Sequence, residues 1–164
     1  PGLPFGPGDR MPTPTGTTII RTMQGKMKNY WDGGVCPVDV RDVAKGHVLA
    51  MEKGRIGESY ILANKDANMN FQDFVQLVGR IAEVEGAGTQ YVSANMMVNV
   101  ARLMEFWSKI SGKAPETTVK NTKFILKECY VDPSKAIEEL GMPQTPIETA
   151  IKDSVEWFRA NGYA

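Results

Sequence analysis

The chain has 164 residues, enough for one domain with a sizeable hydrophobic core. Its 19 basic and 19 acidic residues balance, so the net charge gives no reason to expect broad attraction to nucleic acid or to an acidic membrane. No apolar run approaches the roughly 20 residues that span a bilayer. The two cysteines, Cys36 and Cys129, match no metal-ligand spacing, and we expect reduced thiols in a cytoplasmic protein.

The first 16 residues form a loop rich in proline and glycine. This loop opens without a methionine, a signal peptide or a helix-capping signal, which is typical of the middle of a loop. We therefore expect the chain to be the C-terminal part of a longer protein.

In chain order, the pattern predicts a helix that begins at Thr13 or Thr15 and ends near Gly25. A strand-like segment follows at residues 27–31. The short β-branched run at residues 35–40 then predicts a buried strand.

The central helix follows this strand directly. Asp42 stands where an N-cap belongs, and Gly54 closes the helical pattern. His47, the only histidine, lies midway along this helix and is predicted to be a packing residue. A second strand is predicted at residues 58–63.

Two further helices are predicted in the middle of the chain. Asn70 caps the first, with Asp73 three residues later in the manner of a capping box. Ser93 opens the second and longest, which ends at Gly112, and a short strand at residues 89–92 precedes it. This long helix carries an apolar stripe that is predicted to be core, made of Met96, Met97, Val100, Leu103, Met104 and Trp107.

The last part of the chain is also helical. Residues 116–126 are predicted to be weakly helical. Asp132 and Thr145, each followed by proline, open two more helices, which end at Gly141 and Gly162. The final helix is predicted to direct inward Ile147, Ala150, Ile151, Val155 and Phe158. Short strands separated by helices, with more helix than strand, predict an α/β fold.

A cluster of charged residues, Asp39, Arg41 and Asp42, lies where the predicted strand ends. One interpretation is a helix cap with a solvated ion pair. The other places Asp39 or Arg41 in a crevice, in contact with a polar substrate, because ligands of open α/β sheets bind at the carboxyl ends of strands. The sequence contains no P-loop, no serine-histidine-acid arrangement and no metal-ligand set.

Five segments together resemble the extended short-chain dehydrogenases/reductases. Residues 1–9 read P-G-L-P-F-G-P-G-D, similar to the family's N-P-x-x-x-x-G-P-G-D segment, and residues 38–44 read V-D-V-R-D-V-A. Residues 60–63 read Y-I-L-A, residues 132–143 read D-P-S-K-A-I-E-E-L-G-M-P, and residues 157–163 read W-F-R-A-N-G-Y. Their order and spacing agree over essentially the whole chain. The chain resembles the C-terminal, substrate-binding part of an NAD-dependent epimerase/dehydratase, with hopanoid-associated sugar epimerases and dihydroflavonol-reductase-like proteins as the most similar groups.

The resemblance implies an extended Rossmann-type fold of which residues 1–164 are the substrate-binding part. It also implies two groups of site residues. Those expected beside the nicotinamide ring of NAD or NADP are Pro1, Gly2 and Leu3. Those expected to bind the substrate, a sugar-like or carbonyl compound, are Phe5, Asp9, Arg10, Asp39 and Arg41.

The family's G-x-x-G-x-x-G cofactor motif and its catalytic Tyr-x-x-x-Lys pair occur nowhere in the 164 residues. The resemblance therefore implies a catalytically incomplete chain that binds no cofactor by itself and whose partner is a missing N-terminal Rossmann part. The alternative is a free-standing module derived from this fold, which binds or self-associates without catalysis. A homo-oligomer is possible under either hypothesis, through surfaces other than the helices the family commonly uses.

Overall fold

The computed structural model describes residues 1–115 and 117–163. Its helices are α1 (Pro14–Met23), α2 (Val40–Lys53), α3 (Phe71–Ala82), α4 (Ala94–Ser111), α5 (Val119–Ile125), α6 (Ser134–Leu140) and α7 (Ile147–Ala160). Its strands are β1 (Leu3–Phe5), β2 (Asn29–Tyr30), β3 (Gly34–Val35), β4 (Pro37–Asp39), β5 (Met69–Asn70) and β6 (Gln90–Tyr91). The α/β class and the excess of helix over strand are confirmed.

The strands form three two-stranded sheets. β1 pairs in parallel with β4, β2 in parallel with β6, and β3 antiparallel with β5. In the first pair, Phe5 is the register partner of Asp39. Because the two strands are parallel, their carboxyl ends lie at one edge, and the segments that follow Phe5 and Asp39 meet there.

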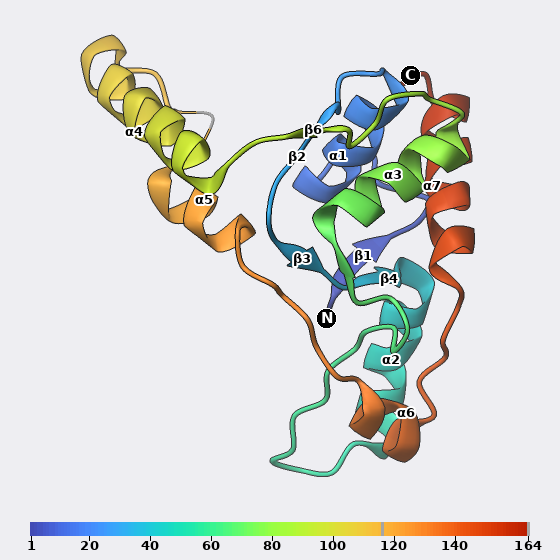
Figure 1. The fold of residues 1–164 in the computed structure, drawn as a ribbon. Coiled ribbons are helices and arrows are strands. Elements are labelled where there is room, and N and C mark those ends of the chain that lie inside the picture. Colours follow the sequence, from blue (N-terminus) through green and yellow to red (C-terminus); the bar gives the residue numbers. More distant parts are fainter. Residues whose placement is uncertain (116, 164) are drawn as a thin grey trace.

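Most of the core lies between α1, α3 and α7, which lie together on one side of β1 in Figure 1. Its larger buried side chains are Phe5, Ile19, Phe74, Val75, Leu77, Val78, Ile151, Val155 and Phe158. All five predicted inward residues of α7 are buried, as predicted. A smaller cluster joins α2 to α6 through Val38, Val43, Leu62, Ala136, Leu140 and Met142.

Three predicted helix caps are present. The Thr13 side chain accepts a hydrogen bond from the Gly16 amide at the start of α1. Asn70 does the same for α3, and Ser93 does so for α4. These caps were predictable because each depends only on residues within one helical turn.

The predicted cap of the central helix is wrong. The N-cap of α2 is Asp39, whose side chain accepts from the Arg41 amide, and the helix begins three residues before the predicted one. Asp42 lies inside the first turn, where its carboxylate accepts hydrogen bonds from the Thr145 amide at 2.6 Å and the Thr145 hydroxyl at 3.0 Å. Two aspartates three residues apart both suit a cap, and the distant partner Thr145 determines which one is used.

The two proline-containing helix starts are displaced by one residue. Pro133 and Pro146 occupy the N-cap position, and the helices begin at Ser134 and Ile147. Asp132 still accepts a hydrogen bond from the Ser134 amide, at 2.9 Å. A shift of this size lies within the ordinary uncertainty of helix boundaries. The predicted helix at residues 116–126 is confirmed over α5, and residue 116 lies outside the described residues.

Residues 58–63 do not form the predicted strand. The segment runs beside β1, but the hydrogen bond recorded between them is the one from the Gly2 amide to the Leu62 carbonyl, at 2.8 Å. The next amide, that of Leu3, donates instead to Cys36. A strand needs a ladder of hydrogen bonds, and this one recorded bond does not make a ladder.

The apolar stripe of α4 is not core, contrary to the prediction. Met96, Leu103 and Trp107 are exposed, and Ala101 is the one buried residue that the structure records on this helix. Figure 1 shows α4 and α5 packed on each other and standing away from the rest of the fold. His47 is also exposed, with its Nδ1 atom 2.8 Å from the Val43 carbonyl oxygen. Periodicity shows which residues share a face, but it does not show what covers that face.

Within the described residues, no helix combines the length and the apolar character that crossing a membrane would require.

Candidate functional site

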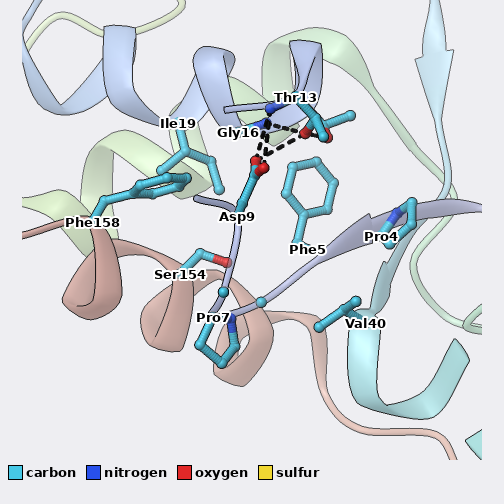
Figure 2. Close-up of a pocket in the computed structure, with 13 residues that line it drawn as sticks. Pro4, Phe5, Pro7, Asp9, Thr13, Gly16, Ile19, Val40, Ser154 and Phe158 are labelled. Carbon is cyan, nitrogen blue, oxygen red and sulfur yellow. Dashed lines mark hydrogen bonds between the residues drawn. The ribbon is translucent and has the colours of Figure 1, made fainter. Parts of the chain in front are cut away.

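A cavity of about 460 Å³ opens where β1 and β4 end (Figure 2). Its floor and walls come from the loop after β1, the first half of α1, the first residue of α2 and the middle of α7. The lining residues are Pro4, Phe5, Gly6, Pro7, Gly8, Asp9, Thr13, Thr15, Gly16, Ile19, Val40, Ser154 and Phe158. The carboxyl edge of the parallel pair is thus the edge that carries the cavity, as expected for this kind of sheet.

The loop after β1 can pass close to α2 because Gly6 has no side chain. A Cβ atom on Gly6 would lie 2.4 Å from Cγ1 of Val40, and the residue has a φ of 153°. Pro4 and Pro7 flank it and restrict the backbone further. The wall of the cavity is therefore held by backbone constraints that cost little additional entropy on ligand binding.

The carboxylate of Asp9 is the charged group in the cavity wall. It accepts hydrogen bonds from the Thr13 amide at 3.0 and 3.1 Å and from the Thr13 hydroxyl at 2.9 Å. Figure 2 shows the carboxylate directed at the first turn of α1, where a negative charge interacts favourably with the helix dipole. A Cβ atom on Gly16 would lie 2.0 Å from the Oδ2 atom of Asp9, so this arrangement requires glycine at position 16.

Replacement of Asp9 by alanine is expected to lower the free energy of unfolding by about 1 kcal/mol, because the amide and hydroxyl of Thr13, the N-cap of α1, lose their acceptor. Asp9→Asn retains one acceptor oxygen and is expected to lower the free energy of unfolding by less. Urea denaturation followed by circular dichroism measures both. Equal losses for the two variants would contradict the assigned hydrogen bonds and would point to the charge alone.

Asp39 and Arg41 form a second charged group beside the cavity. Asp39 is fully buried, and its carboxylate accepts from Arg41 Nε at 2.9 Å and from Nη2 at 2.5 Å. The same Nη2 atom lies 2.7 Å from Asp153 on α7. Burial by itself disfavours the charged form of Asp39, but the hydrogen bonds and charge of Arg41 outweigh it, so the pKa of Asp39 lies below its ordinary value.

The interpretation of this cluster as a helix cap with an ion pair describes the structure with two differences: the cap is Asp39 and not Asp42, and its carboxylate is buried and not solvated. Hydrogen bonds to Asp39 and Asp153 raise the pKa of Arg41 above its ordinary value, so Arg41 is a permanent cation. Neither Asp39 nor Arg41 is among the lining residues of the cavity, whereas Val40 between them is.

The remaining site residues predicted from the sequence do not line the cavity. Pro1, Gly2 and Leu3 are at the opposite end of β1 from the cavity, and the amides of Gly2 and Leu3 donate to Leu62 and Cys36. Arg10 is exposed, and its carbonyl accepts a hydrogen bond from the Tyr163 hydroxyl at 2.5 Å. The cavity thus combines Phe5 and Asp9 of the predicted set.

Gly2 and Leu3 already make contacts within the fold. A Cβ atom on Gly2 would lie 2.6 Å from the Cys36 carbonyl oxygen, so packing between strands already explains this glycine. Because the amides at positions 2 and 3 are paired within the fold, they cannot also bind a phosphate.

Several polar lining residues were not singled out from the sequence. Thr13 and Thr15 lie on the first turn of α1, with their hydroxyl oxygens 2.9 Å apart. Ser154 is buried on α7 and donates to the Ala150 carbonyl at 2.8 Å. A serine among the apolar inward positions of α7 was the available signal, because a polar residue on a core stripe is unusual.

The cavity can therefore bind a small molecule, but its side chains offer few groups for acid-base catalysis. It combines aromatic walls from Phe5 and Phe158 with one carboxylate and three hydroxyl groups. Such a surface suits a compact organic molecule that carries hydroxyl groups and one apolar face. Among the described residues, no group of three or more histidine, cysteine, aspartate or glutamate side chains could hold a metal ion.

The chain is similar in sequence and in fold to several known proteins. No protein-family model matches it. A Synechocystis protein (strain PCC 6803) named provisionally as dihydroflavonol 4-reductase is 35% identical over 99% of this chain and 48% of its own length. The crystal structure of gox2253 has a TM-score of 0.80 and 35% identity, covering 99% of this chain and 48% of that one.

A nucleoside-diphosphate-sugar epimerase from Pseudomonas aeruginosa has a TM-score of 0.76 and 28% identity, over 99% of this chain and 47% of that one. A UDP-glucuronic acid 4-epimerase from Bacillus cereus, solved with NAD, is 15% identical with a TM-score of 0.62 and shares the fold alone. The chain spans about half the length of the curated relatives it matches. These matches, each over about half of the other protein, agree with the resemblance to the C-terminal part of an extended short-chain dehydrogenase/reductase.

Proposed function

We propose that this chain is the substrate-binding part of an NAD(P)-dependent epimerase or reductase that acts on a sugar-like or carbonyl-bearing small molecule. The observation that carries the proposal is the 460 Å³ cavity at the carboxyl edge of β1 and β4, in a chain with 35% identity to a provisional dihydroflavonol 4-reductase. The similarity to a nucleoside-diphosphate-sugar epimerase supports the sugar-like alternative.

In this proposal Phe5 and Phe158 contact the apolar face of the substrate, while Asp9 and the hydroxyls of Thr13 and Thr15 bind its hydroxyl groups. Their positions follow from α1 and the stiff loop after β1, so the substrate is oriented without a large entropic cost. Arg10 lies at the outer end of the same loop. We assign Asp39 and Arg41 to the edge of the site, where they hold Val40 in the wall.

We further propose that catalysis requires residues outside these 164. The Tyr-x-x-x-Lys pair and the G-x-x-G-x-x-G motif are absent from the sequence. Pro1, Gly2 and Leu3 are proposed to lie beside the nicotinamide ring when a nucleotide-binding part is present. NAD or NADP would supply the redox chemistry there, and no chemical step is assigned to residues of this chain.

The test is ligand binding without turnover. Isothermal titration with UDP-glucose and with an aromatic hydroxyketone is expected to show binding of one of the two ligands. Thr15→Phe, which fills the cavity, is expected to weaken that binding at least tenfold, because a ligand cannot share the space. Thr18→Phe lies on the same helix outside the cavity and is the matched control.

Two outcomes would contradict the proposal. Binding that Thr15→Phe leaves unchanged would place the substrate elsewhere. Steady oxidation of NADH or NADPH by the purified 164-residue chain would show that catalysis does not need further residues.

A further inference from the structure

Helix α4 carries an exposed apolar stripe. Met96, Val100, Leu103, Trp107 and Ile110 recur at steps of four and three residues, so they share one face of the helix. Leu103, Trp107 and Ile110 are between 63% and 68% exposed. Figure 1 shows α4 and α5 together as an arm, residues 94–115 and 117–127 of the described chain, that stands away from the main body. No element of the described chain covers the stripe.

A second cavity lies on the same face. It has a volume of about 460 Å³ and is lined by Val100, Leu103, Met104 and Trp107, with the exposed Lys113 beside them. Residues of the apolar stripe therefore also line a recess. An apolar recess with a cation beside it suits a flexible hydrocarbon chain that ends in an anionic group.

The charge of the arm differs from that of the rest of the chain. Residues 94–127 contain six basic residues, Arg102, Lys109, Lys113, Lys120, Lys123 and Lys127, and two acidic ones, Glu105 and Glu116. The remaining 13 basic and 17 acidic residues carry a net negative charge. The zero net charge of the whole chain is therefore the sum of a positively charged arm and a negatively charged remainder.

These cations are available to an external partner. Glu105 is occupied within the arm, where its carboxylate accepts from the Val119 amide at 2.8 Å. In the described part of the chain, no recorded ion pair includes any of the six basic residues. A second copy of this chain would bring an equally cationic arm against the first, and this repulsion disfavours self-pairing along the stripe.

We propose that the arm docks on an anionic lipid surface, with the α4 stripe among the acyl chains and Lys109 and Lys113 at the headgroups. An amphipathic helix with Trp, Phe and Leu on one face and Lys or Arg beside it is the form that lies in a membrane interface without crossing it. This proposal rests on charge and exposure in the arm and is independent of the proposed enzymatic function.

The test is sedimentation of the 164-residue chain with vesicles. Vesicles of phosphatidylcholine and phosphatidylserine at about three to one are expected to bind the chain at least tenfold more strongly than pure phosphatidylcholine. Raising the salt from about 0.1 M to about 1 M is expected to weaken that binding, because the headgroup contacts are screened. The double variant Leu103→Glu/Trp107→Glu is expected to lose it.

The matched control is Met51→Glu/Ile56→Glu, which places the same two charges at exposed residues outside the arm and is expected to bind as the original chain does. Circular dichroism verifies that each variant is folded. Absence of binding, or equal binding by the double variant, would overturn the proposal. A concentration-dependent dimer in analytical ultracentrifugation that the double variant abolishes would identify a second copy as the occupant and would also overturn it.

Discussion

Replacement of Phe158 by alanine is expected to lower the free energy of unfolding by about 3–5 kcal/mol. Phe158 is 1% exposed and lies in the larger core cluster on α7. Its ring packs edge-on against Tyr163, with the ring centroids 5.5 Å apart, and its Cζ atom would be 3.0 Å from a Cβ atom on Gly16. Because backbone and aromatic groups surround the ring, the space left by alanine cannot collapse fully.

Urea denaturation followed by circular dichroism measures this loss. The matched control is Phe106→Ala, the same change at a side chain that is 64% exposed. It is expected to alter the free energy of unfolding by less than about 0.5 kcal/mol. Equal effects of the two variants would show that α7 does not pack as described.

The second large effect is expected for Asp39→Ala, which should lower the free energy of unfolding by about 2–4 kcal/mol. The change removes the N-cap of α2 and the buried partner of Arg41. Arg41 keeps Asp153, and this remaining pair limits the loss. The measurement is again urea denaturation.

Asp39→Asn separates the two contributions. Asparagine is as good an N-cap as aspartate, so this variant keeps the cap and loses the charge. We expect it to be more stable than Asp39→Ala and less stable than the original chain. An asparagine variant as stable as the original would show that the ion pair contributes nothing.

The stability of the original chain should also depend on pH through Asp39. Because the pKa of Asp39 is lower in the folded state than in the unfolded state, its contribution is fully present above the unfolded value, about 3.9, and is lost as the pH falls through the folded value. The stability difference between the original chain and Asp39→Asn should therefore shrink as the pH is lowered from about 6 to about 3. A constant difference would contradict the assigned pKa direction.

The charges of the arm show that the net charge of a chain does not describe how its charges are distributed. A formal charge of zero suggested no attraction to an acidic surface, yet six of the 19 basic residues lie within residues 94–127. Net charge sums over the whole chain, whereas attraction to a surface depends on the charges that face it. In this fold those charges are gathered because α4 and α5 stand apart from the body.

The sequence by itself determined the features that depend on nearby residues. Asn70 and Ser93 were identified as caps, Thr13 was one of two candidates, and the inward face of α7 was correct, because these signals extend over a turn or two of helix. The ordered motifs also indicated the resemblance with which the comparisons agree, since their order and spacing persist along the chain.

Only the tertiary structure decided the features that depend on distant partners. Thr145 gives Asp42 a role other than the cap, residues 58–63 pair with no strand of the described chain, and no described element covers the α4 stripe. The cavity joins the loop after β1 to Ser154, about 150 residues along the chain. Such contacts depend on which surfaces come together in the folded chain. The secondary-structure propensity of a segment does not indicate which other segment will pack against it.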